Sequence, residues 1–214
     1  MTQSLAHLLP VLSTIPGVNI PVSVLQGISI AASGRKIEQL EQALRHEVGL
    51  LTRQIEAGEL HLDSDYAGSD AFTANVIQAL RAAEIAEGET KLHFIARALA
   101  GCSLYFPPPS LDKVQTMRVI EGLSERELKV FTGLFGLLDP IDPYSDSLPT
   151  GSAATVGGLT RQEFAAALLG LGQLGLLTKE TVQANDWSDP APAWKLTALA
   201  RQVATLSRVG PKEL

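Results

Sequence analysis

Residues 35–58 read RKIEQLEQALRHEVGLLTRQIEAG and carry the longest helical pattern of the chain. Apolar residues recur at steps of three and four, which places them on one side of a helix. Charged residues, Glu47 among them, occupy the other sides and are expected at the surface. The pattern predicts a long amphipathic helix over about residues 22–57. Its apolar stripe consists of Ile37, Leu40, Leu44, Val48, Leu51 and Ile55.

This apolar stripe is narrow and resembles a coiled-coil seam about three heptads long. Two burial modes fit it equally well at the level of sequence. The stripe packs either against other helices of the same chain or against a second copy. In the second case Leu44 and Leu51, which lie near its middle, are candidate partner-binding residues.

Composition limits the class of protein. The chain has 214 residues, 45% of them hydrophobic but only 5% aromatic, with alanine and leucine dominant, which favours helices. A net charge of -6 gives no general attraction to nucleic acid or anionic lipid. Cys102 is the only cysteine, so no disulfide forms within the chain. We expect a cytoplasmic protein in which Cys102 is a small buried residue.

The first 34 residues contain no charged side chain. They lack the basic start of a signal peptide, and Pro10, Pro16 and Pro21 interrupt any helix long enough to span a membrane. We expect a short helix, a turn and the start of the long helix, packed in a soluble protein. The alternative is a membrane-associated hairpin that turns at residues 16–19.

Residues 59–70, ELHLDSDYAGSD, begin like a calcium-binding loop. Asp63, Asp65 and Gly68 match positions 1, 3 and 6 of the EF-hand pattern. Alanines occupy positions 5 and 12, where the cation requires oxygen ligands. The sequence therefore predicts no metal site here, but a solvated loop whose Ser69 or Asp70 caps the next helix.

Two further helices are expected, one ending near Gly88 and one ending before three consecutive prolines, residues 107–109. A proline run of this kind forms a stiff connector. It predicts a domain boundary that separates a helical domain, residues 1–109, from a second domain, residues 110–214.

Two helix starts in the second half are well defined. Ser124 with Glu127, and Thr160 with Glu163, have the spacing of capping boxes. The helices that follow are expected to run to about residues 138 and 174, and Gly175 is placed to end the second one in a left-handed conformation. The segment between them is rich in Pro, Ser and Gly and is expected to be loop.

After Gly175 the sequence predicts a strand at 176–184, a polar turn, a returning strand at 193–196 and a last helix capped by Thr197. The order from residue 124 to 209, with GLL before the first strand and WKLTALAR leading into the last helix, resembles a winged helix-turn-helix domain. It departs from that family at the second helix, expected within residues 148–158. The predicted fold class is mainly α: an N-terminal helical domain and a winged-helix-like domain with a small β-hairpin.

The winged-helix resemblance implies DNA binding, with the helix at 160–174 in the recognition position. With Phe164, Leu168, Leu171 and Leu174 toward the core, Gln162, Ala166, Leu169, Gly170 and Gln173 are expected to face outward. The residues available to DNA are then Arg161, Gln162, Lys179 and Lys195. This set is small for a protein that needs several phosphate contacts as well as base contacts.

An outward face of Ala, Leu and Gln is better suited to another protein. The leading interpretation is therefore a non-enzymatic helical interaction protein that docks onto a protein partner or onto a second copy. A homo-oligomer is expected. The candidate partner-binding residues are Gln162, Ala166, Leu169, Gln173, Leu44 and Leu51.

Enzyme motifs are missing from the sequence. It contains no GxSxG elbow, no Walker phosphate loop and no HExxH pair, and its four histidines have no ligand spacing. We therefore expect no catalytic, cofactor-binding or metal-binding residues and no cofactor.

Overall fold

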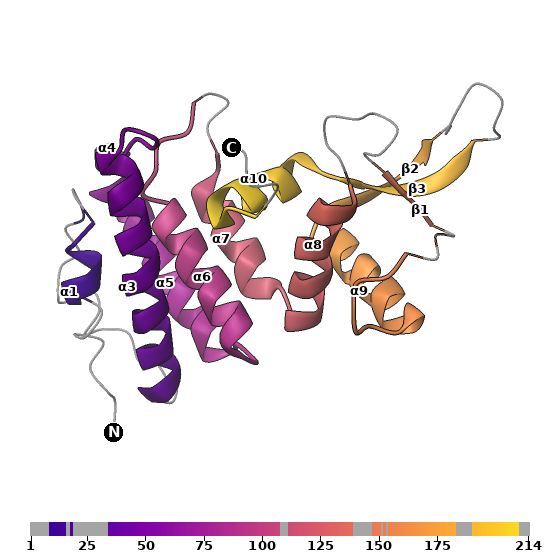
Figure 1. The fold of residues 1–214 in the computed structure, drawn as a ribbon, viewed down its shortest axis with the longest axis horizontal. Coiled ribbons are helices and arrows are strands. Elements are labelled where there is room, and N and C mark those ends of the chain that lie inside the picture. The colour runs from indigo at the N-terminus through magenta and orange to yellow at the C-terminus, as the bar shows by residue number, and fades with distance from the viewer. Residues whose placement is uncertain are drawn as a thin grey trace. The chain divides into compact units, whose positions relative to one another are not determined.

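The computed structural model describes residues 9–15, 18, 34–107, 111–138, 147–150, 152, 154–182 and 190–209 (Figure 1). The protein is mainly helical, with one small antiparallel sheet. The chain divides into two compact units. Unit 1 comprises Met1–Gly122 and Leu206–Arg208, and unit 2 comprises Leu123–Thr205 and Val209–Leu214.

Unit 1 is a bundle of helices. Helix α3 packs against α5 and α6, and α5 packs in turn against α6 and α7. In Figure 1 these helices run from indigo to magenta. The described helices are α1 (Leu9–Leu12), α3 (Gly34–Glu56), α4 (Ser64–Ala67), α5 (Asp70–Glu84), α6 (Glu89–Gly101) and α7 (Lys113–Gly122).

The apolar stripe of α3 lies inside unit 1. Its central residues Leu40, Leu44, Val48 and Leu51 are at most 5% exposed, while both ends of the stripe are half-buried. The stripe therefore packs against helices of its own chain. Leu44 and Leu51 are core residues, so the hypothesis that they bind a partner is wrong. Residues 22–33 of the predicted helix lie outside the described part.

The described part of the N-terminal segment is the short helix α1 and the turn after it. Val11, Leu12 and Ile15 are buried, and α1 packs on α3. This confirms the short helix and turn for residues 9–15. Within the described ranges, no helix is both long and apolar enough to cross a membrane. The hairpin alternative at residues 16–19 falls mostly outside these ranges.

The boundary between the units does not follow the proline run. Helix α7, which begins after it, packs against α5 and belongs to unit 1. The division lies between Gly122 and Leu123, whereas the sequence placed it at residues 109 and 110. The proline run was interpreted as a linker between domains, but it connects two helices of the same bundle.

Unit 2 begins with α8 (Glu125–Leu137) and also contains α9 (Arg161–Gln173) and most of α10 (Ala198–Ser207). Both predicted capping boxes are present. Ser124 and Thr160 each accept a hydrogen bond from the backbone N–H three residues later, and a glutamate side chain accepts one in return. Gly175 has a φ of 75°, and the Thr197 hydroxyl accepts from the N–H of Ala200, as predicted.

The sheet of unit 2 has the order β1-β3-β2, with both pairings antiparallel. Its strands are β1 (Ser147–Pro149), β2 (Leu177–Val182) and β3 (Ala191–Leu196). Strands β2 and β3 confirm the predicted hairpin. Strand β1 lies in a segment predicted to be loop, and its Leu148 pairs with Trp194 of the central strand.

The second helix that the resemblance requires is not seen in the described residues of 148–158. Gly157 and Gly158 form a turn there, and Gly158 has a φ of 83°. Just before this turn, the side chain of Val156 lies against Gly133 of α8. In the described residues 154–160, a segment without regular secondary structure and a turn therefore lead into α9.

Candidate functional site

The outer face of α9 is the main candidate site. Leu169 is 53% exposed, and Ala166 and Gln173, the exposed residues before and after it on this side of α9, are uncharged. We use the name "α9 face" for Gln162, Ala166, Leu169 and Gln173, all of which are exposed. These are the four α9 residues that the sequence proposed as partner-binding.

The α9 face is held outward because the opposite side of the helix is buried. Phe164, Leu168 and Leu171 are in the core of unit 2, as predicted, whereas Leu174 is only half-buried. Gly170, which was expected on the α9 face, instead lies against the side chain of Glu127 at the start of α8. That close approach is the reason a glycine is needed there.

The first turn of α9 is fixed by Glu163. Its carboxylate accepts hydrogen bonds from the backbone N–H of Thr160 at 2.9 Å and from the Thr160 hydroxyl at 2.8 Å. Both bonds lower the pKa of Glu163 below its ordinary value, and the bond from the backbone N–H has the larger effect. Arg126 of α8 lies 3.5 Å from the same carboxylate. The negative charge of Glu163 therefore already has partners within unit 2, namely Thr160 and Arg126.

The residues named for DNA binding lie on two elements, helix α9 and the β2–β3 hairpin. Arg161 is exposed at the start of α9. The ammonium of Lys179 lies 4.7 Å from the centre of the Trp194 ring, a cation–π contact. Lys195 lies 3.6 Å from the carboxylate of Glu180. Two of the three cations thus have partners in the hairpin that carries them.

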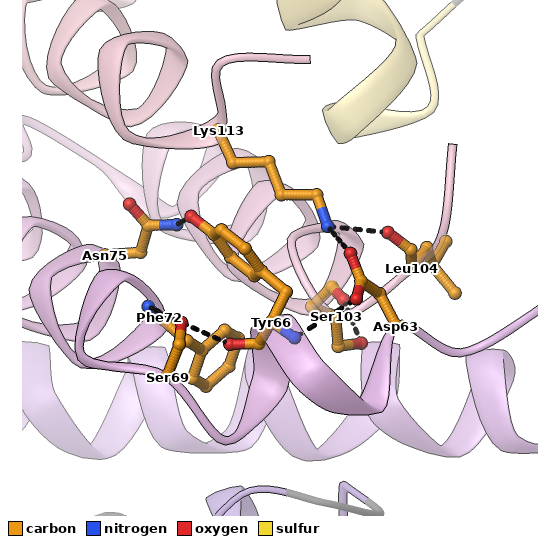
Figure 2. A network of polar contacts seen from close by, with 9 residues as sticks. Asp63, Tyr66, Ser69, Phe72, Asn75, Ser103, Leu104 and Lys113 are labelled. Atoms are coloured by element: carbon orange, nitrogen blue, oxygen red, sulfur yellow. Dashed lines mark hydrogen bonds and ion pairs between the residues drawn. The ribbon is translucent and has the colours of Figure 1, made fainter. Parts of the chain in front are cut away.

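A second cluster, in unit 1, is polar and partly buried (Figure 2). The ammonium of Lys113 donates to Asp63 at 2.9 Å and to the carbonyl of Leu104 at 2.8 Å, and it lies 4.1 Å from the centre of the Tyr66 ring. The hydroxyl of Tyr66 accepts from the buried amide of Asn75 at 2.8 Å. These contacts join the segment after α3, helix α5, the segment after α6 and helix α7.

Two groups at this cluster, the Cys102 thiol and the Tyr66 hydroxyl, stay protonated at neutral pH. Burial raises the pKa of the Cys102 thiol to about 12, against the opposing effects of the Lys113 charge and a hydrogen bond with Asn75. Burial is also the largest cause that raises the pKa of Tyr66, followed by the nearby Cys102. A neutral, fully buried thiol is a poor nucleophile. The cluster is suited to holding segments together, and Asp63, expected in a solvated loop, is part of it.

The predicted loop at 59–70 is more ordered than expected. Asp63 caps the short helix α4, and Ser69 accepts from the N–H of Phe72 at the start of α5, as predicted. Among the described residues, no group of three or more His, Cys, Asp or Glu side chains is arranged to hold a metal ion. A shallow depression of about 170 Å³ lies between α3 and α6, lined by Gln39, Gln42, Ala43, Glu89, Leu92 and His93.

A third polar group surrounds Glu47, which is only 2% exposed and not at the surface as expected. Its carboxylate pairs with the guanidinium of Arg97 at 3.4 Å and with that of Arg208. Nothing in the helical pattern of residues 35–58 identifies Glu47 as buried, because both partners come from elsewhere in the chain.

No protein-family model matches the chain, and neither does any curated protein or any solved structure. The site is therefore interpreted from its own geometry.

Proposed function

We propose that the chain is a non-enzymatic, cytoplasmic interaction protein, and that unit 2 is a winged-helix-like module that docks onto protein through the α9 face. The observation that carries this proposal is the exposure of Leu169, 53%, at the centre of a face without charged side chains. On this face an exposed leucine has alanine and glutamine as neighbours, so the face lacks charged residues. The centre of a protein–protein interface is likewise poor in charged residues.

The winged-helix part of the proposal is supported by connectivity. Helix α8, helix α9, the hairpin β2-β3 and helix α10 follow one another in the order on which the resemblance rests. The resemblance lacks a helix in the described residues between β1 and α9. In this proposal α9 has the position of a recognition helix but presents a surface for protein.

DNA binding is the alternative function, and the charges favour it less. Arg161 is the only basic residue of α9. Lys179 and Lys195 already contact Trp194 and Glu180. Binding to a duplex would require these lysines to leave their partners, which reduces the gain from each phosphate contact.

The experiment is affinity retention of proteins from native cell extract on the immobilised full chain. Leu169→Asp places a charge at the centre of the α9 face. Ile85→Asp is the matched control, because Ile85 is 59% exposed but belongs to unit 1. We expect proteins that are retained by the wild type and by Ile85→Asp, but lost with Leu169→Asp. Equal retention by all three chains, from a wild type that also remains monomeric in solution, would contradict the proposal.

A further inference from the structure

The α9 face has the spacing of a short coiled-coil seam. Its residues Gln162, Ala166, Leu169 and Gln173 follow one another at steps of four, three and four, and all are exposed. This is the spacing at which two helices pack side by side. We propose that the partner of the α9 face is a second copy of this chain, with the two α9 helices antiparallel. This inference rests on the proposed function, because it names the partner of the same face.

The face is complementary to itself in that arrangement. A two-fold axis between residues 167 and 168 places Gln162 opposite Gln173 of the second copy, and Ala166 opposite Leu169. The large side chain of Leu169 then packs over a small one, twice. At each end two amide side chains meet, and each amide can both donate and accept a hydrogen bond.

Charge selects the antiparallel direction. Arg161 lies at the N-terminal end of α9, so a parallel pair would place two arginines side by side. In the antiparallel pair each Arg161 comes close to the C-terminal end of the other helix, where the carbonyl groups carry negative partial charge. Glu163 does not oppose this, because its carboxylate is already bound by Thr160 and faces Arg126.

The size of the seam limits its strength. Helix α9 has 13 residues, and a helix rises about 1.5 Å per residue, so the seam is about 20 Å long. One helix pair in contact over that length buries less surface than a standard interface, which buries about 800 Å² per partner. We therefore expect a reversible dimer with a dissociation constant on the order of micromolar or weaker.

The test is sedimentation velocity on the full chain from about 1 to 500 µM, a range chosen around the expected dissociation constant. The double variant Gln162→Glu/Gln173→Lys puts opposite charges across both ends of the antiparallel seam. We expect it to dimerise about three- to tenfold more tightly at low salt. The double variant Gln162→Glu/Gln173→Glu is the matched control, in which like charges meet, and it should dimerise more weakly than wild type.

Both positions are exposed, so the variants should keep the thermal stability of the wild type, which circular dichroism checks. A wild type that stays monomeric up to about 500 µM would overturn self-pairing. So would a dimer that is insensitive to Leu169→Asp, or one that the opposite-charge variant weakens. A monomeric wild type that still retains Leu169-dependent proteins from extract would overturn only this inference and leave the proposed function standing.

Discussion

Glu47 of α3 and Arg208, which follows α10, form an ion pair inside unit 1 across 161 positions of sequence. Arg208 ends the helix in a left-handed conformation, with a φ of 50°, and its guanidinium also lies 3.3 Å from the side-chain oxygen of Gln54. Burial lowers the pKa of Arg208, and the negative charge of Glu47 opposes that shift. One buried carboxylate therefore fixes the end of α10 to α3.

Replacing Glu47 tests this ion pair. Glu47→Ala leaves Arg97 and Arg208 without their shared counter-ion, and we expect the free energy of unfolding to fall by about 2–4 kcal/mol. The estimate is below that for a fully buried pair because the two arginine side chains are 38% and 25% exposed. Urea denaturation measures the change.

Glu41→Ala is the control on the same helix. Glu41 pairs with Arg45 at 2.7 Å, and the arginine side chain is 62% exposed. A pair of this kind contributes about 0.3–0.5 kcal/mol. Equal losses for the two variants would show that Glu47 acts as an ordinary surface residue.

Two glycine-to-alanine substitutions should change the stability of the fold in opposite directions. A Cβ at Gly101, the last residue of α6, would collide with the backbone carbonyl of Leu206, so we expect Gly101→Ala to cost about 1–3 kcal/mol. Gly49, within α3, has no atom within 4 Å of such a Cβ. Gly49→Ala should therefore stabilise by about 0.5–1 kcal/mol through helix propensity. Thermal melting compares them, and a stabilising Gly101→Ala would contradict the packing of Leu206.

Local signals accounted for much of the fold. The two capping boxes, the left-handed Gly175 and the stripe of α3 were predictable because each depends on residues within a few positions of one another. Strand β1 was not, because three residues in a segment rich in Pro, Ser and Gly become a strand only by pairing with β3. The unit boundary was missed for the same reason, since the packing of α7 on α5 is a long-range contact.

Alkaline pH should lower the free energy of unfolding, because the Cys102 thiol has a higher pKa in the folded chain than in the unfolded chain. Its pKa rises from 9.0 to about 12 on folding, so above pH 9 the unfolded chain loses a proton that the folded chain keeps. The contribution to stability is complete below pH 9 and is lost as the pH rises toward 12, at up to about 1.4 kcal/mol per pH unit for this one group.

Urea denaturation at pH 8 to 11 measures this dependence. The stability of Cys102→Ala should decline less steeply over that range than the stability of wild type, whatever its value at pH 8. Parallel curves for the two proteins would show that the thiol titrates normally in the folded state.

The contacts in Figure 2 predict that removing the hydroxyl of Tyr66 lowers stability more than removing that of Tyr105. Tyr66→Phe removes the acceptor of the buried Asn75 amide, which should cost about 1–3 kcal/mol. Tyr105 is 53% exposed, so Tyr105→Phe should change stability by less than about 0.5 kcal/mol. Chemical denaturation of both variants checks this, and equal effects would contradict the role assigned to the Tyr66 hydroxyl.

The candidate site was predictable to the same degree as the fold. The exposure of Gln162, Ala166, Leu169 and Gln173 followed from helical periodicity, whereas the outward placement of Gly170 was wrong because α8 packs against it. The clusters around Lys113 and Glu47 were missed. Lys113 meets Asp63 at a separation of 50 residues, and Arg97 meets Glu47 at the same separation. No periodic pattern encodes such pairs.

The most direct test of the α9 face as a protein surface is fluorescence anisotropy with duplex DNA at about 50 and 150 mM salt. Wild type, Arg161→Ala and Leu169→Arg are compared. Three cations correspond to a salt slope of about -3 for each bound chain, so we predict only weak, nonspecific binding at the higher salt. Leu169→Arg adds a cation to the α9 face and should leave that binding weak. Nanomolar affinity at about 150 mM salt that Arg161→Ala abolishes and Leu169→Arg strengthens would contradict the account.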